Sequence, residues 1–377
     1  MWDVAVAGGG PAGCMVAGEL ARRGFEVCLL EKEKIPRKKP CGGGLPPHTV
    51  EFLRKNGIDY PDCCQKKASV AQLYCDFEDP VDVDLDSAAI QLVDRTRFDA
   101  RLVDWARQQG AGVVTETAVE AVEVESNRVI FSASENIRES ARFFALTCGP
   151  ASELPKKIKI GPLRAGGVAM ACHLPFSAGF EDPDKLIFNL LSKINGYGWV
   201  FPKKDHLNVG IAGGKTDVSY PCLLKKFIKE TFAVSEIPPD IPRFGFLLPF
   251  YNDNVRFVRG RVAVAGDAGG FVDPVTGEGI YYALKSGKIL ANAIETALRG
   301  DRELSTVYRS RLEKHILPDL RRAGWLARLL YGAPGLFYKL IMKRKLGEKT
   351  FKQIARGDVT YRNIFVALSR EFLNVKR

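Results

Sequence analysis

The sequence predicts an α/β fold. One domain with a parallel sheet and helices is interleaved with a second domain built on an antiparallel β-sheet, and further helices follow at the C-terminus. Two passages that run from a strand through glycines into a helix, one at the N-terminus and one after residue 259, predict the first domain. Between them, residues 155–258 are β-rich and include a strictly alternating stretch, which predicts antiparallel strands. The 377 residues, 46% of them hydrophobic, are enough to bury such cores.

The N-terminal passage carries a G-x-G-x-x-G motif in its full strand–turn–helix context. A short apolar strand over residues 3–7 runs directly into the glycines, and a helix is expected to continue to Arg23. In such a Rossmann-type turn the first glycine allows the tight bend, the second lets a pyrophosphate approach the backbone, and the third lets the helix pack on the strand. The helix N-terminus also offers N–H groups and a positive dipole to phosphate. We therefore predict dinucleotide contacts at Gly8, Gly10, Pro11, Ala12 and Gly13.

An acidic residue completes this motif. A second strand over residues 26–30 ends on Glu31, which lies 18 residues after the last glycine. A carboxylate at this place can accept hydrogen bonds from both ribose hydroxyls, and its charge repels a 2′-phosphate. Glu31 and the neighbouring Lys32 are therefore predicted cofactor contacts. The motif alone does not distinguish NAD from FAD.

Three later stretches make that distinction. Residues 94–102 have the pattern of a helix start, residues 261–268 form a strand that ends on a glycine and an acid, and residues 273–280 open a long helix. No second G-x-G-x-x-G motif follows a strand, so a separate NAD(P)H domain is not expected.

Together these stretches resemble the large flavoprotein group that includes p-hydroxybenzoate hydroxylase and the geranylgeranyl reductases. The resemblance implies that Asp267 holds ribityl or ribose hydroxyls of FAD, and that the following helix points its first amides at the flavin pyrimidine ring, where a helix N-terminus stabilises negative charge. The chain departs from the group at residues 147–150 (Thr-Cys-Gly-Pro), where its relatives have Asp-Gly. The further FAD contacts that the resemblance implies are Arg95, Gly266, Asp267, Gly277, Gly279 and Ile280.

Two motifs point to the substrate. Residues 196–203 alternate strictly, so Tyr197, Trp199 and Phe201 are expected on one face of a strand as an apolar wall, or simply as part of a core. Earlier in the chain, Cys41 lies on a bare loop of sequence Lys-Pro-Cys-Gly-Gly-Gly, which is either a turn or a surface for a flat ligand.

The pair of motifs K-P-C-G-G and Y-x-W-x-F-P resembles the geranylgeranyl reductase family, whose members include chlorophyll, bacteriochlorophyll and archaeal lipid enzymes. The resemblance runs from Met1 to about Ala297. It implies that the cysteine loop and the aromatic strand bracket a polyprenyl chain beside the flavin. The substrate pocket would then consist of Cys41, Gly43, Tyr197, Trp199, Phe201 and Pro274, with Cys41, Gly42 and Gly43 also contacting the cofactor.

The function that follows is an FAD-dependent reduction of isolated C=C bonds of a geranylgeranyl-type chain. Protonation of one alkene carbon builds cationic character on the other, which a flavin hydride can then quench. Cys41 is the predicted proton donor or gating thiol, Tyr197 is the alternative donor, and Trp199 belongs to an electron-rich wall that steadies positive charge. The electron donor would be NAD(P)H or a ferredoxin-like electron-transfer protein. The head group of the substrate stays open among a lipid, a quinone, a tetrapyrrole and a diphosphate.

Two alternatives share this scaffold. An FAD-dependent aromatic monooxygenase or halogenase would need a polar pocket for an aromatic substrate. A prenyl-lipid binding or escort protein would use a related fold without flavin chemistry, and such proteins lack an intact set of cofactor residues.

Composition and charge predict where the protein works. Nine scattered cysteines and the absence of a leader pattern favour a cytoplasmic protein without disulfides, no apolar run is long enough to span a membrane, and no clustered ligands indicate a metal. Between Lys314 and Arg356, eleven Lys and Arg face only Asp319 and Glu348, a net charge of +9. Because aromatic and aliphatic residues alternate with these charges, we expect a face that contacts an anionic membrane peripherally. A nucleic-acid-binding patch is not expected, because no nucleic-acid-binding motif accompanies these charges. A solvated basic helix that packs on its own domain remains an alternative interpretation.

These expectations divide the chain into six segments. Residues 1–75, 94–154 and 259–300 would form the FAD-binding domain, and residues 76–93 and 155–258 would form the substrate domain. Residues 301–377 would be helical, basic and membrane-facing.

Overall fold

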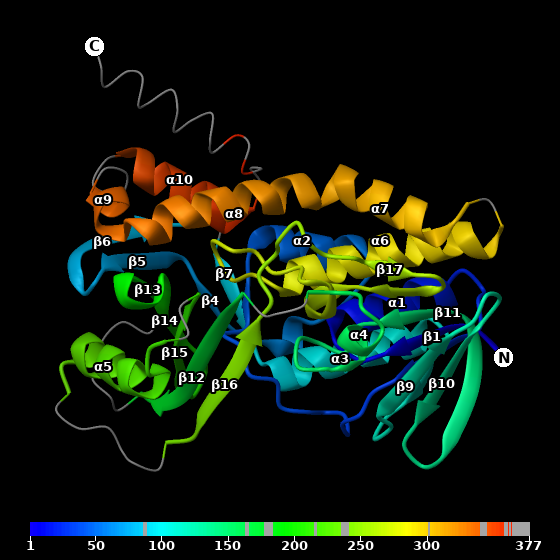
Figure 1. Cartoon of the computed structure of the whole chain (residues 1–377). Coiled ribbons are helices and arrows are strands. Elements are labelled where there is room, and N and C mark those ends of the chain that lie inside the picture. The colour runs from blue at the N-terminus through cyan, green and yellow to red at the C-terminus, as the bar shows by residue number, and fades with distance from the viewer. Residues whose placement is uncertain are drawn as a thin grey trace. The chain divides into compact units, whose positions relative to one another are not determined.

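The computed structural model describes residues 1–85, 89–162, 166–176, 184–214, 217–234, 241–300, 302–339, 345–357, 361 and 363 (Figure 1). The chain forms two compact units, each assembled from three segments. The first unit comprises residues 1–39, 96–166 and 247–321, and the second comprises residues 40–95, 167–246 and 322–377.

The first unit is built on an eight-stranded sheet. Its central strand β1 (Trp2–Ala7) is parallel to β2 (Val27–Leu30) on one side and to β11 (Ile137–Leu146) on the other. All four residues of β2 and the last four of β1 are buried, as expected for strands that are covered on both faces. The remaining strands are β8 (Gly112–Val114), β9 (Val119–Val124), β10 (Val129–Ala133), β17 (Val258–Arg259) and β18 (Val262–Val264).

Helices α1 (Pro11–Ala21) and α6 (Ile280–Leu298) pack directly on each other in this unit. Glycine makes the close approach possible, because a Cβ on Gly287 would lie 2.5 Å from the carbonyl oxygen of Ala12. The other α-helices of the described residues are α2 (Pro47–Lys55), α3 (Arg95–Gln108), α4 (Leu154–Lys157), α5 (Tyr220–Phe232), α7 (Leu304–His315), α8 (Leu317–Gly332), α9 (Pro334–Phe337) and α10 (Lys345–Arg356).

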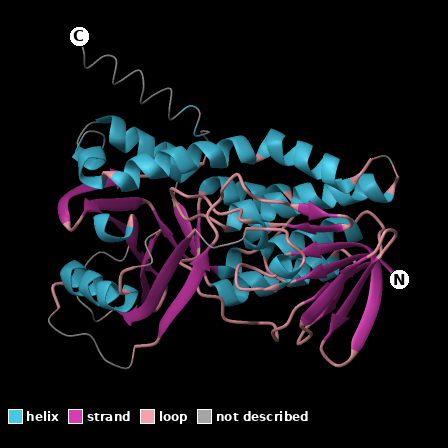
Figure 2. Cartoon of the chain, in the orientation of Figure 1, coloured by secondary structure: helices cyan, strands magenta, loops and turns pink. Residues whose placement is uncertain are grey.

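The second unit is built on a seven-stranded sheet, drawn with the other strands in Figure 2. Strands β12 (Gly167–Pro175), β15 (His206–Gly213), β14 (Gly196–Pro202) and β13 (Lys185–Leu191) are antiparallel neighbours. The sheet is completed by β5 (Val70–Cys75), β6 (Glu78–Asp84) and β16 (Arg243–Leu248). A smaller sheet contains β3 (Gly44–Leu45), β7 (Ile90–Val93) and β4 (Cys64–Ala68).

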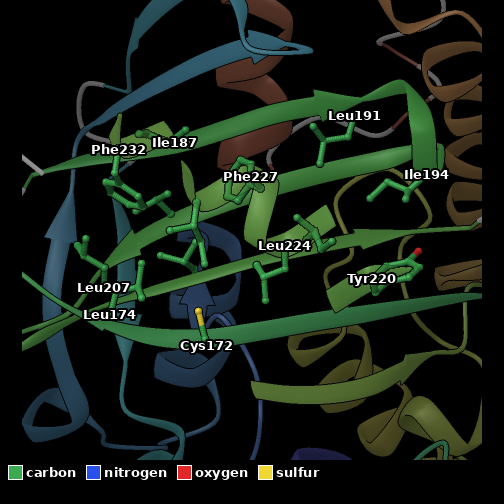
Figure 3. Close-up of a cluster of buried hydrophobic side chains, with 14 residues drawn as sticks. Cys172, Leu174, Ile187, Leu191, Ile194, Leu207, Tyr220, Leu224, Phe227 and Phe232 are labelled. Atoms are coloured by element: carbon green, nitrogen blue, oxygen red, sulfur yellow. The ribbon is translucent and has the colours of Figure 1, made fainter. Parts of the chain in front are cut away.

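Both faces of the large sheet are covered. On one face, Leu224 and Phe227 of α5 enter a cluster of buried side chains (Figure 3). The helix approaches closely because a Cβ on Gly198 would lie 2.5 Å from the Phe227 ring. On the other face, Tyr338 and Phe351 from the C-terminal region pack with residues of β5, β13 and β14.

The structure confirms the predicted α/β class with an antiparallel sheet domain and C-terminal helices. It groups several stretches in another way than the expected segments. Residues 155–166 and 247–258, expected in the substrate domain, belong to the first unit together with residues 301–321, and residues 94–95 belong to the second unit. Residues 40–75 belong to the second unit, because β3, β4 and β5 pair with strands of that unit. Residues 322–377 also belong to the second unit, and the Tyr338 hydroxyl donates a hydrogen bond to Leu73 O at 2.7 Å there.

Candidate functional site

The turn after β1 has the geometry that the glycine motif predicts. Gly8 adopts a φ of +105°, and a Cβ there would lie 2.7 Å from the carbonyl oxygen of Thr147. A Cβ on Gly13 would lie 1.9 Å from the carbonyl oxygen of Gly8, so this glycine brings α1 onto the strand. By contrast, a Cβ on Gly10 would have its nearest neighbour 3.9 Å away, at Arg37 Nη2. The side of Gly10 that would face a phosphate is therefore open.

The start of α1 suits an anion. Pro11 is the first helical residue, Gly10 precedes it in an extended conformation, and the first turn carries no acidic side chain. The N–H groups of this turn therefore meet no competing charge from their own helix. Ala12 and Gly13, which follow Pro11 in this turn, are buried.

Glu31 is held at the carboxyl end of β2. Its Oε2 accepts a hydrogen bond from the Gly9 N–H at 2.7 Å, and its Oε1 accepts one from the Glu33 N–H at 3.0 Å. Arg37 lies between two carboxylates, with Nε 3.6 Å from Glu31 Oε2 and Nη1 3.2 Å from the fully buried Asp99. The glycine turn, the acid and Arg37 thus lie together, and Arg37 is a candidate phosphate contact that the sequence analysis missed. Its distance from the motif in the chain hides it.

Lys32 lies beside this cluster with an exposed side chain, and its Nζ is 3.6 Å from Glu33 Oε1. Arg95 is 9% exposed at the start of α3 and belongs to the second unit.

The second part of the predicted FAD site follows β18. Gly266 has a φ of +61°, and a Cβ there would lie 2.9 Å from the Cβ of Ala12, so the two turns meet. A Cβ on Gly279, which precedes α6, would lie 3.3 Å from Asp267 Oδ1. The structure thus brings the predicted Gly266, Asp267 and Gly279 to the start of α6.

The loop before α6 is held by its own acid. The buried Asp273 accepts hydrogen bonds from the N–H groups of Val275 and Thr276, at 2.7 and 3.0 Å. Pro274 lies within this turn and is partly buried. Gly277 adopts a φ of +70°, and Ile280 is the first residue of α6. The glycine-rich start of this helix carries no acidic side chain in its first turn, so it suits the negative charge of a bound anion.

In the second unit, Cys41 lies on a loop that packs against the aromatic strand β14. The Gly43 N–H donates to Cys41 Sγ at 3.3 Å, and Asn208 Nδ2 donates to Cys41 O at 3.3 Å. A Cβ on Gly42 would lie 2.9 Å from the Phe201 ring, so the loop approaches the ring closely. Position 42 therefore requires a glycine because of this close approach, whereas a turn without such a contact would accept a side chain there.

Tyr197, Trp199 and Phe201 lie along one face of β14, as the alternation predicts. Their ring centroids are 6.1 Å and 6.4 Å apart along the strand. The ring of Phe188 on β13 lies 5.4 Å from that of Phe201, and Phe351 of α10 lies 5.8 Å from Phe188. We call these five residues the aromatic wall.

Two polar residues at the aromatic wall were also missed from the sequence. Trp199 Nε1 donates to Asn208 Oδ1 at 2.8 Å, which fixes the indole. Lys203 is 4% exposed, and its Nζ donates to Val93 O at 3.1 Å. Burial lowers the pKa of this ammonium to about 8, from the ordinary 10.5. The alternation of Tyr197, Trp199 and Phe201 continues to Lys203, and this signal could have revealed it.

Several known proteins have sequences or structures similar to this chain. Residues 1–143 match the family described as the FAD binding domain. Geranylgeranyl diphosphate reductase of Rhodobacter capsulatus is 28% identical over 79% of this chain and 76% of its own length. The chain is a flavoprotein related to the geranylgeranyl reductases. An uncharacterized protein of Methanosarcina barkeri is 26% identical over 99% of the chain and 96% of its own length. Digeranylgeranylglycerophospholipid reductase 1 of Methanosphaera stadtmanae is 25% identical over 78% of the chain and 76% of its own length.

Solved structures confirm the fold. A geranylgeranyl bacteriochlorophyll reductase-like protein from Thermoplasma acidophilum superposes with a TM-score of 0.78 at 22% identity, covering 98% of this chain and 96% of that protein. A flavin-dependent brominase superposes with a TM-score of 0.75 at 18% identity, covering 98% and 99%. The predicted resemblance to the geranylgeranyl reductases is confirmed, and the chain is an FAD-dependent oxidoreductase. The contacts of individual residues with FAD and with substrate stay predictions.

Proposed function

We propose that this flavoprotein reduces isolated C=C bonds of a geranylgeranyl-type chain. The observation that carries the proposal is the close packing of the Cys41 loop on the aromatic wall. Because Gly42 has no side chain, nothing separates the backbone of this loop from the Phe201 ring. An apolar wall beside the Cys41 thiol suits a hydrocarbon that has to be protonated.

The bound FAD would supply the hydride, with Glu31 and Asp267 as its ribose and ribityl contacts. The chain's own residues supply the other requirements. The aromatic wall excludes water and faces the cationic carbon with electron-rich rings. Cys41 donates its Sγ proton to the other alkene carbon, and Tyr197 is the alternative donor. Arg95 and Pro274 stay proposed contacts of cofactor and substrate.

The proposed substrate class is a polyprenyl chain on a lipid-like carrier. The names of the relatives refer to geranylgeranyl diphosphate and to digeranylgeranylglycerophospholipid, which share only the isoprenoid chain. Electrons would come from NAD(P)H or from a ferredoxin-like protein.

The test combines flavin reduction with mass spectrometry of the prenyl products. Cys41→Ala and Cys41→Ser should keep a reducible flavin and lose chain saturation by at least about 10²-fold, which is typical for loss of general acid catalysis. A gating role would instead give smaller losses and release of partly reduced chains. Tyr197→Phe is run beside them, and the exposed Cys222→Ala is the matched control. Full activity in Cys41→Ala would refute a role for this thiol, and the absence of any saturation by wild-type protein with reduced flavin would refute the function.

The second candidate function is that of an aromatic halogenase or monooxygenase, because the fold is also similar to that of a flavin-dependent brominase. Such an enzyme would consume NADPH and O₂ faster when a phenol is added, whereas the reductase would not. A colourless protein that cannot be reconstituted with FAD would instead favour prenyl-lipid escort.

We also propose that the protein contacts an anionic membrane through α8 and α9. No helix within the described residues is both long and apolar enough to cross a bilayer. Trp325, Leu329 and Leu336 are 64%, 57% and 63% exposed. Trp325 and Leu329 share a helix face, and the Arg328 guanidinium lies 5.5 Å from the Trp325 ring centroid. Exposed apolar side chains among cations suit an anionic lipid surface.

Flotation with liposomes tests this contact. Wild-type protein should float with anionic vesicles at low salt and less at high salt, because each cation contributes about 1 kcal/mol near the surface. Leu329→Ser and Trp325→Ser should each reduce flotation, whereas the matched Ser substitution at the exposed Leu247 should not. Equal binding to neutral and anionic vesicles at all salt concentrations would refute the electrostatic contribution.

A further inference from the structure

Lys203 is a buried cation at the end of the aromatic wall. It directly follows β14, its backbone N–H donates to His206 O at 2.7 Å, and its side chain is 4% exposed. An ammonium that is removed from water is costly unless charge or hydrogen bonding at that place compensates. The Nζ donation to Val93 O at 3.1 Å compensates part of this cost.

The ammonium of Lys203 and the thiol of Cys41 both lie beside Gly43. The Gly43 N–H donates to Cys41 Sγ at 3.3 Å, while a Cβ on Gly43 would lie 2.9 Å from Lys203 Nζ and 2.5 Å from Val93 O. Gly43 has a φ of +69°, and its carbonyl accepts from the Val93 N–H at 2.8 Å. The loop thus has the conformation that places its sulfur and the ammonium around one glycine.

Charges near Lys203 agree with this arrangement. Burial is the largest effect and lowers the pKa of Lys203 to about 8. Cys41 is the first of the groups that oppose this lowering, Asp94 and Cys64 follow, and Arg95 adds to it. An amine with a pKa of about 8 is about nine-tenths protonated at pH 7, yet it can release its proton readily. Lys203 is therefore suited to exchange a proton with a neighbouring group.

We propose that Lys203 is the positioning residue of Cys41, which stabilises the thiolate left after proton donation and then returns a proton to its sulfur. This inference rests on the proposed function. In each turnover the Sγ–H proton goes to one alkene carbon, and the other carbon receives a hydride, with its electron pair, from the reduced flavin. One Nζ–H proton then moves to the thiolate, and the neutral amine regains a proton from water. The balance is one hydride, which carries both electrons, from the flavin and one proton from solvent.

A purely structural role makes a different prediction. If Lys203 only ties the end of β14 to Val93, its charge has no effect on the sulfur, and the reactivity of Cys41 is independent of it. The readout must therefore report on the thiol rather than on turnover.

The experiment measures alkylation of Cys41 by iodoacetamide in the full-length, flavin-loaded protein, with peptide mass spectrometry to separate this cysteine from the others. Iodoacetamide reacts with the thiolate, and an adjacent cation favours that form. Lys203→Met should slow alkylation at pH 7 about tenfold or more, because the variant lacks the positive charge that the proposal assigns to stabilising the thiolate. Lys203→Arg, which keeps the charge, should stay close to wild type. Lys204→Met, at the exposed next position, should have no effect.

The same variants separate this inference from the proposed function. Lys203→Met should also lower multiple-turnover saturation of the prenyl chain at least about tenfold, with partial rescue in Lys203→Arg. Unchanged alkylation in Lys203→Met overturns the inference, even where Cys41→Ala confirms the role of the thiol. If Lys203→Met does not fold, Lys203→Gln is measured, and an alkylation rate equal to wild type overturns the inference equally.

Discussion

Replacing Lys203 by methionine should change how the stability of the protein depends on pH. The pKa of Lys203 in the folded chain is about 8, below the ordinary 10.5, because the ammonium is buried. Between these two values the unfolded chain binds more protons than the folded one, so the stability contributed by Lys203 rises with pH in this window. Below about pH 8 both states are protonated, and the penalty for burying the charge is present in full.

The size of the effect follows from the two pKa values. The interval from about 8 to 10.5 corresponds to roughly 3 kcal/mol of unfavourable charge burial at neutral pH. About 2.5 kcal/mol of this penalty should disappear between pH 7 and pH 10. Methionine has a similar length and no charge, so the variant lacks the pH dependence. It leaves Val93 O without its donor at every pH, which lowers stability by about 1–3 kcal/mol without changing the slope.

The assay is urea unfolding of flavin-loaded wild-type and Lys203→Met protein at pH 7 and pH 10, followed by circular dichroism and by flavin fluorescence. The other titrating groups are common to both proteins, so the difference in unfolding free energy isolates Lys203. Wild type should gain about 2.5 kcal/mol relative to the variant at the higher pH. A difference that stays constant within about 0.5 kcal/mol would refute the buried ammonium, and with it the proton exchange proposed for Cys41.

Three further predictions concern the glycines and the cofactor acids. Gly10→Ala should fold normally and bind flavin at least about tenfold more weakly, because its Cβ meets nothing closer than 3.9 Å in the protein and points to the expected phosphate. Gly13→Ala should fail to fold, since its Cβ would lie 1.9 Å from a backbone oxygen. Equal stability of the two variants, measured by thermal unfolding, would contradict this difference. Glu31→Ala and Asp267→Ala should each weaken flavin binding by roughly 1.5–3 kcal/mol, about ten- to a hundredfold, and full flavin occupancy in both purified variants would place the cofactor elsewhere. Gly42→Ala should lose chain saturation, because a Cβ 2.9 Å from an aromatic ring displaces the loop or the ring at about 1–3 kcal/mol. Unchanged product formation would argue against a catalytic loop.

The parts of the fold that depend on local geometry could be predicted from the sequence. The turn at Gly8 needs a positive φ, and the contact at Gly13 leaves no room for a Cβ. The glycines at these two positions therefore indicate a specific local geometry. The face shared by Tyr197, Trp199 and Phe201 follows from the two-residue period of a strand. Such features involve residues close in the chain, and the structure reproduces them.

Long-range contacts could not be predicted in this way. Arg37 reaches Asp99 across 62 positions, and nothing in either neighbourhood marks the pair. Lys203 is different, because it continues the alternation of the aromatic strand and a strict period places it on the buried face. Lysine is usually exposed, so its residue type argues against the burial that the period indicates. A charged residue in register with a buried face is therefore worth testing for a functional role, as proposed here for Lys203.

The C-terminal region shows why composition alone is ambiguous. Basic residues mixed with aromatic ones occur both on membrane-facing helices and on helices that close a protein core. In α8 the pattern leaves Trp325 and Leu329 exposed, whereas Tyr338 is 1% exposed and Phe351 joins the aromatic wall. Only burial distinguishes the two uses, because a cation can keep its charged end in water while its stem and neighbours pack inward. The surface proposed for the membrane is therefore limited to α8 and α9, and α10 instead supplies part of the wall for the proposed polyprenyl chain.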